Sequence, residues 1–128
     1  MTARIFDFAD GFTSSNAPTE LGGITIVSNQ AIGSGGQITL SSATRQLLKV
    51  SGSGGAQIAS TTPFSSTPID GIKIILHGTD GTNTLEIQNN DAAGGCLLNG
   101  DAILGLNDEL TLVYDATADR YYEESRNF

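Results

Sequence analysis

One stretch decides the fold of this chain, and it reads Glu109-Leu-Thr-Leu-Val-Tyr-Asp-Ala-Thr-Ala-Asp-Arg-Tyr-Tyr-Glu-Glu-Ser-Arg126. Its first half alternates, so that Leu110, Leu112 and Tyr114 share one face, as in a strand with a single buried side. A short polar run then separates it from a second strand that begins at Arg120. We predict a β-hairpin here, and its composition favours a scaffold over a catalyst.

The same rhythm of short apolar runs between Gly, Asn and Asp continues through most of the chain and predicts an all-β protein. Roughly eight to ten short strands at this spacing indicate a β-sandwich, a jelly-roll-like or a barrel-like body of antiparallel strands. Ile72 to Leu76 is apolar nearly throughout and is predicted to be a central strand covered on both faces. The other predicted strands lie at Ile24–Ser28, Gln37–Leu40, Gln46–Val50, Gln57–Ala59, Thr84–Asn89, Cys96–Leu98 and Ala102–Leu104.

A tetrapeptide is repeated in the middle of the chain. Gly33-Ser-Gly-Gly36 recurs as Gly52-Ser-Gly-Gly55, and Gln-Ile follows each copy closely. The repeat hints at a duplicated hairpin unit, although two copies do not define a solenoid. Neither copy precedes the Lys-Ser or Lys-Thr of a phosphate loop, so both are predicted to be turns.

The chain has 128 residues, which suits one domain. We assign residues 22–128 to a single β domain and residues 1–21 to an extended N-terminal arm. Within the arm, Phe6 and Phe8 share a face across Asp7. This arm folds back as an ordinary first strand or docks on a neighbouring subunit, and in the second case its partner-binding residues are Ile5, Phe6, Phe8 and Phe12.

Charge, hydropathy and cysteine content exclude several classes of partner and of structure. The chain holds 14 acidic and 6 basic residues, a formal charge of -8, and would repel a nucleic-acid backbone. No apolar run is long enough for a membrane span or a signal peptide, so we expect neither a membrane partner nor an export signal. The single cysteine, Cys96, excludes an intrachain disulfide and fits assembly in a reducing compartment.

Candidate reactive groups are few, and we expect neither an enzyme nor a cofactor. His77 is the only histidine and is predicted to be a hydrogen-bonded residue at a strand end. Cys96 has no basic neighbour in sequence and is predicted to be a small buried residue. Asp80 is predicted to cap its own turn, with positive φ at Gly81, in preference to binding calcium. Tyr114, Tyr121 and Tyr122 are predicted to be core and rim residues, although they could form a stacking platform for a ligand.

The C-terminal part of the chain resembles a β-rich module of structural proteins from tailed bacteriophages, mostly tail fibres and small virion proteins. The likeness spans roughly residues 70–128 and differs at Leu106, where glycine is frequent, and at Tyr122, where tryptophan is frequent. The segments that carry it are Leu85-Glu-Ile-Gln88, Leu97-Leu-Asn-Gly-Asp-Ala-Ile-Leu104, Leu106-Asn-Asp-Glu-Leu-Thr-Leu-Val-Tyr-Asp115 and Tyr121-Tyr-Glu-Glu-Ser-Arg126.

The resemblance implies a virion structural protein, assembled in the host cytoplasm and working as a homotrimer. A small body with an apolar arm suits a capsid decoration (cement) protein whose arm binds the major capsid protein, another virion protein or the adjacent subunit. The alternative is a short tail-fibre, tailspike or adaptor component that binds a host glycan or a tail protein through Tyr121, Tyr122 and Glu123. A carbohydrate-active enzyme is a third class, and it would need two converging carboxylates.

Overall fold

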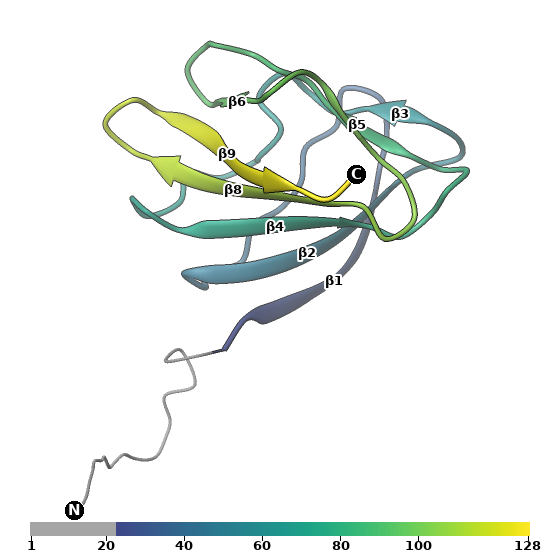
Figure 1. Ribbon diagram of the computed structural model, residues 1–128, viewed down its shortest axis with the longest axis horizontal. Coiled ribbons are helices and arrows are strands. Elements are labelled where there is room, and N and C mark those ends of the chain that lie inside the picture. Colours follow the sequence, from purple (N-terminus) through teal and green to yellow (C-terminus); the bar gives the residue numbers. More distant parts are fainter. Residues whose placement is uncertain (1–22) are drawn as a thin grey trace, which may run out of the picture.

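The computed structural model describes residues 23–128, which are all-β and contain no helix. The predicted arm lies outside the described residues. Nine strands form within the described part (Figure 1), with bounds β1 Thr25–Ile32, β2 Arg45–Gly52, β3 Gln57–Ile58, β4 Lys73–Gly78, β5 Leu85–Ile87, β6 Gly95–Leu97, β7 Ala102–Leu104, β8 Glu109–Asp115 and β9 Arg120–Arg126.

The strands form two sheets between which the chain winds. The larger sheet has the order β1-β2-β4-β8-β9-β6, and the smaller has the order β3-β5-β7. In Figure 1, β1, β2, β4, β8 and β9 lie side by side in this order from bottom to top, and β3 and β5 lie together at the upper right. From β2 the chain passes through β3 of the small sheet and enters the large sheet again as β4, one strand further on. From β4 it passes through β5 to β6, which pairs with β9 at the far edge of the large sheet. This arrangement is a β-solenoid of about four turns.

The predicted sandwich, jelly roll or barrel of antiparallel strands is wrong, because the first coils stack in parallel. β1 pairs with β2, β2 with β4, and β3 with β5, all parallel. Antiparallel pairing begins where the chain reverses direction, at β4–β8, β5–β7 and β8–β9. Alternation of side chains specifies a half-buried strand but not the direction of the neighbouring strand. Parallel pairing therefore could not be predicted from the sequence pattern.

The two sheets advance by the same step from the second coil to the third. Lys49 pairs with His77 in the large sheet and Gln57 pairs with Leu85 in the small sheet, so both advance by the same number of residues there. The step from β1 to β2, where Thr25 pairs with Gln46, is shorter. The two Gly-Ser-Gly-Gly turns lie at the same corner of successive coils. There the amide of Ser53 donates to the carbonyl of Ile32 at 2.9 Å, and the amide of Gly35 donates to that of Ile58 at 2.8 Å.

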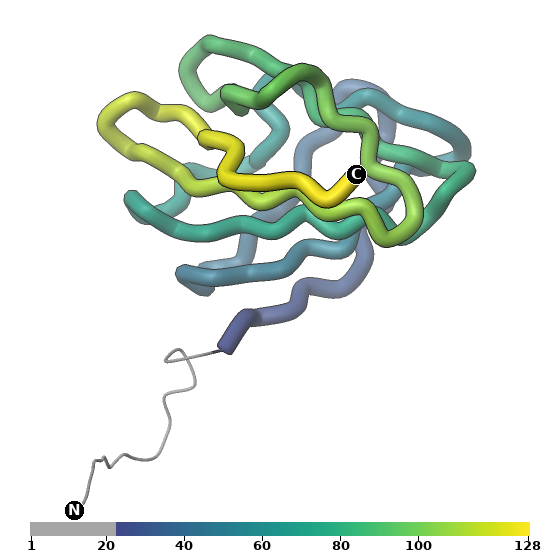
Figure 2. Tube along the Cα trace, in the orientation of Figure 1, coloured from purple at the N-terminus to yellow at the C-terminus, as the bar shows by residue number. Residues whose placement is uncertain are grey.

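Figure 2 traces the coils of the chain as a tube. The core lies between the two sheets and along the inner side of each coil. The predicted inward face of β8 is confirmed, since Leu110, Leu112 and Tyr114 are buried. Leu85 and Ile87 of β5 are buried as well. The fully buried large apolar side chains are Ile38, Leu48, Val50, Ile74, Leu76, Leu85, Ile87, Leu104, Leu110 and Leu112.

Two predictions about individual segments fail. Ile72 to Leu76 is not covered on both faces, since Lys73, Ile75 and His77 of β4 remain partly exposed while Ile74 and Leu76 are buried. The predicted strand at Gln37–Leu40 is reduced to one bridge, in which Ile38 pairs with Phe64 of the adjacent coil.

Candidate interaction face

The side of the large sheet that points away from the core carries an unusual mixture of apolar and charged side chains. We call it the outer face and define it by the outward residues of β1, β2, β4, β8 and β9. The strand alternation and the pairing register assign to it Ile26, Arg45, Leu47, Lys49, Lys73, Ile75, His77, Glu109, Thr111, Val113, Tyr122 and Glu124.

Apolar side chains form two groups on the outer face. Ile26 pairs with Leu47, which pairs with Ile75, and Val113 pairs with Tyr122 on the neighbouring strands β8 and β9. Ile26 is 64% exposed and Tyr122 is 40% exposed, while the three between them are partly buried. Exposed apolar side chains that lie together on one surface are typical of protein–protein contacts.

Charges on the outer face are divided between its strands. Lys73 of β4 makes an ion pair with Glu124 of β9 at 3.0 Å, and Nδ1 of His77 lies 2.8 Å from Oε2 of Glu109. The predicted hydrogen bond of His77 is therefore confirmed. Arg45 and Lys49 of β2 are exposed and make no ion pair with another described residue. The face thus has spare positive charge on β2.

The predicted partner residues fall in different places. Ile5, Phe6, Phe8 and Phe12 lie outside the described residues. Tyr121 is 3% exposed and stacks against Phe64 and Tyr114 at ring distances of 4.5 and 4.7 Å. Its burial raises the pKa of its phenol.

Tyr122 and Glu123 are neighbours in sequence but have different surroundings. Tyr122 lies on the outer face, whereas the carboxylate of Glu123 accepts a hydrogen bond from Nε of Arg126 at 2.7 Å and from the amide of Asn99 at 2.7 Å. The bond from Arg126 is the main cause that holds the pKa of Glu123 below its usual value of 4.5. The structure therefore places Tyr122 alone of the three on an accessible surface, and Glu123 and Tyr121 stabilise the fold.

The tip of the β8–β9 hairpin is acidic. Four carboxylates gather around it, and we call this region the hairpin end. Each already accepts a hydrogen bond: Asp70 from the amide of Ala116, Asp115 from the amides of Thr117 and Ala118, Asp119 from the hydroxyl of Tyr114, and Asp91 from Nε of Arg120. Burial, with the nearby Asp119, Asp70 and Asp115, raises the pKa of Tyr114 to about 12.

The remaining candidate groups have structural surroundings. Cys96 is fully buried, as predicted, and burial raises the pKa of its thiol to about 12. Asp80 caps its own turn, as predicted, by accepting from the amides of Thr82 and Asn83 at 2.8 Å each. The predicted positive φ at Gly81 is wrong.

Two absences concern the described residues alone. Among residues 23–128, no group of three or more His, Cys, Asp or Glu side chains is placed to hold a metal ion. The same residues contain no helix with the length and apolar character needed to cross a membrane.

Comparison with known proteins finds no family and a distant structural similarity. No family model matches the chain, and no curated protein matches it. One solved chain, from a structure described as "Structure of a chaperone-substrate complex", is similar with a TM-score of 0.46 and 9% sequence identity. The match covers 71% of this chain and 14% of that chain, so this chain spans a small part of the other's length.

Proposed function

We propose that this protein is a structural component of a bacteriophage virion, serving as a capsid decoration protein. In this role the β-solenoid is a rigid body, and the arm with Ile5, Phe6, Phe8 and Phe12 anchors it to the shell. One observation carries the proposal: the residues of the phage-like motif are those that make the turns and caps of the body. The motif therefore describes an architecture and not a reaction site.

The first of these turns joins β7 to β8. The carboxylate of Asp108 accepts a hydrogen bond from the amide of Gly105 at 2.8 Å, and Asn107 adopts a left-handed conformation with φ of 67°. Asn and Asp tolerate this conformation better than most residues. The motif positions thus hold the corner at which the chain passes from the small sheet back to the large sheet.

The last motif segment ties the end of the chain to the body. Nη2 of Arg126 donates to the carbonyl of Gly100 at 2.9 Å, and its Nε donates to Glu123. Charge-assisted bonds of this kind are the stronger ones in proteins and hold planar groups in one orientation. A body whose last strand is held by these bonds supports a role that depends on shape and rigidity.

The test is particle binding by a chain whose arm is altered. Replacing Ile5, Phe6, Phe8 and Phe12 by serine should leave the β body folded and abolish its binding to undecorated capsids of a phage that carries this protein. The matched control replaces the polar arm residues Thr13, Ser14, Ser15 and Asn16 by alanine, and we expect it to bind normally. Bound copies are counted by electron cryomicroscopy of the particles. Full occupancy by the serine variant would reject anchoring by the arm, and absence of the native protein from every particle would reject the virion role.

A further inference from the structure

We propose that the outer face binds the acidic hairpin end of a second copy of this chain, so that copies join head to tail into a closed ring. This inference rests on the proposed structural role, and it names the surface through which the subunits meet. Three properties of the described residues carry it: the charge of the outer face, the charge of the hairpin end and the placement of these two surfaces on the molecule.

The outer face has a small excess of basic over acidic side chains in an acidic protein, since Glu109 and Glu124 also lie on it. Of the five lysines and arginines among the described residues, Arg45, Lys49 and Lys73 lie on it, while the whole chain has a net charge of -8. Lys73 is already paired with Glu124, which leaves Arg45 and Lys49 available to a partner. A surface with this charge attracts an acidic partner, and another copy of the same chain is one.

The hairpin end supplies the opposite charge. Its four carboxylates, from Asp70, Asp91, Asp115 and Asp119, face one basic side chain, Arg120. Hydrogen bonds to the backbone and to Tyr114 hold Asp70, Asp115 and Asp119 in fixed positions without neutralising them, whereas Asp91 is paired with Arg120. A preorganised acidic surface loses less side-chain entropy on binding than flexible acids would.

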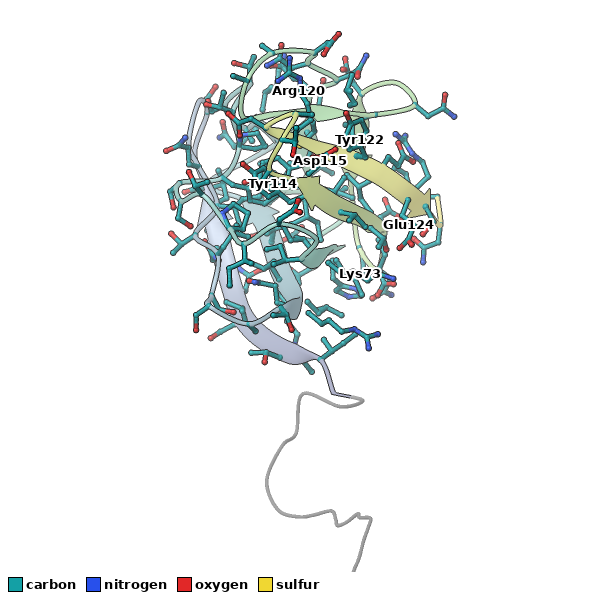
Figure 3. The ribbon with its side chains drawn as sticks, turned by 90° about the vertical axis from the view of Figure 1, so that its left-hand side faces the viewer. Lys73, Tyr114, Asp115, Arg120, Tyr122 and Glu124 are labelled. Carbon is teal, nitrogen blue, oxygen red and sulfur yellow. The ribbon has the colours of Figure 1, made fainter. Side chains whose placement is uncertain are left out.

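The two surfaces lie on different sides of the molecule. Figure 3 looks toward the hairpin end, with Asp115 and Tyr114 near its centre, while Lys73, Tyr122 and Glu124 lie to the right on the outer face. An interface that joins two different patches is heterologous, and repeated copies then close into a ring or grow into a filament. We choose the ring because it is the form that limits the number of copies, as the proposed decoration role requires.

Apolar contact adds to the charge. Ile26 is 64% exposed at the edge of the outer face, beside Leu47. Burying such a side chain on association contributes enough to change a dissociation constant by about tenfold or more. The face therefore combines an apolar centre with a charged rim, the usual arrangement of a protein interface.

The first experiment measures the mass of the full chain in solution by sedimentation velocity over a range of concentrations. We expect a discrete ring for the native protein and a dissociation constant about tenfold or more higher for Ile26→Ser. The matched control is Ile103→Ser, because Ile103 is 53% exposed on β7 of the small sheet, away from the outer face. Equal effects of the two substitutions would overturn the proposal, as would a native chain that remains monomeric.

The second experiment tests the head-to-tail geometry. One variant carries Arg45→Glu and Lys49→Glu, which reverse the charge of the outer face and prevent it from binding the hairpin end. The other carries Ala116→Lys and Thr117→Lys, which oppose the charge of the hairpin end while both exposed positions keep the backbone amides that Asp70 and Asp115 bind. Each variant alone should be monomeric, and an equimolar mixture should form a one-to-one dimer, since one intact interface remains. A mixture that stays monomeric, or either variant forming rings alone, would overturn the proposal.

These outcomes are separate from those of the particle experiment. A chain that decorates capsids as a monomer would refute the ring and leave the virion role standing. Conversely, rings that never bind a particle would refute the virion role and leave the interface standing.

Discussion

Gly78, at the end of β4, shows how closely the coils approach at single residues. Its amide donates to the carbonyl of Asp108 and its carbonyl accepts from the amide of Asn107, both at 2.8 Å. A Cβ atom added here would overlap the carbonyl oxygen of Gly105. Backbone atoms held on both sides cannot move aside cheaply, so only glycine fits.

Gly78→Ala is therefore expected to destabilise the fold by about 1–3 kcal/mol through overpacking. Gly33→Ala is the control, because no atom lies within 4 Å of its added Cβ. Both substitutions restrict the unfolded chain equally, so the difference between them measures the close approach alone. Urea unfolding of the two variants provides the comparison, and equal midpoints would contradict it.

The lowered pKa of Glu123 makes the stability of the fold depend on pH. Its folded-state pKa lies below the usual 4.5, chiefly because Arg126 bonds its ionised form. The stabilisation is thus fully present above pH 4.5 and is lost as the pH falls through the folded-state pKa. Glu123→Gln should cost about 1–3 kcal/mol at neutral pH, and this deficit should shrink in acid. Denaturant unfolding across the acid range tests this, and a deficit that stays constant far below pH 4.5 would argue against it.

At the scale of elements, the positions of strands could be predicted, but their partners could not. Ala102–Leu104 matches β7, and the predicted hairpin corresponds to β8 and β9 within one residue at each end. Direction and pairing depend on where each corner sends the chain. The repeated Gly-Ser-Gly-Gly turn is the sequence signal of stacked coils. The third coil lacks this tetrapeptide and has Thr79-Asp-Gly-Thr-Asn83 at the same corner, so the repeat is not visible there.

The outer face escaped prediction for the same reason. Alternation in β2 indicates that Arg45, Leu47 and Lys49 point to one side of a strand. It gives no means of knowing that Ile26 lies beside Leu47, or that Lys73 follows Arg45 in the next coil. Surface chemistry that arises between coils becomes visible only when the register is known.

The third-coil corner leads to a prediction about Asp80. Its Oδ1 accepts from the amides of Thr82 and Asn83, and its Oδ2 accepts from the side-chain amide of Asn83 at 3.0 Å. Asp80→Ala removes all three bonds and should lower the melting temperature, while Asp80→Asn keeps a carbonyl oxygen and should lower it less. Because both oxygens are engaged within the turn, added calcium should leave the melting temperature of the native protein unchanged. A rise with calcium would instead identify a cation site.

For the whole molecule, the solenoid distributes stability unevenly. β4 lies between β2 and β8, so both its edges are paired and its inner face is buried. β1 is an edge strand, paired with β2 alone among the described strands, and most of its residues are exposed. Local opening is easiest where few apolar contacts and few paired edges restrain the backbone.

Amide hydrogen exchange of the full chain should therefore be slowest in β4 and fastest, among the large-sheet strands, in β1. Association through the outer face adds a second dependence, because Ile26 of β1 lies within that face. We expect exchange in β1 to slow as the native protein is concentrated into rings, and to remain fast in Ile26→Ser at the same concentrations. Exchange in β4, which is protected within each subunit, should change little in either protein. Slowing of β1 to the same extent in both would show that Ile26 is not part of the contact, and equal protection of β1 and β4 in the dilute monomer would refute the uneven stability of the solenoid.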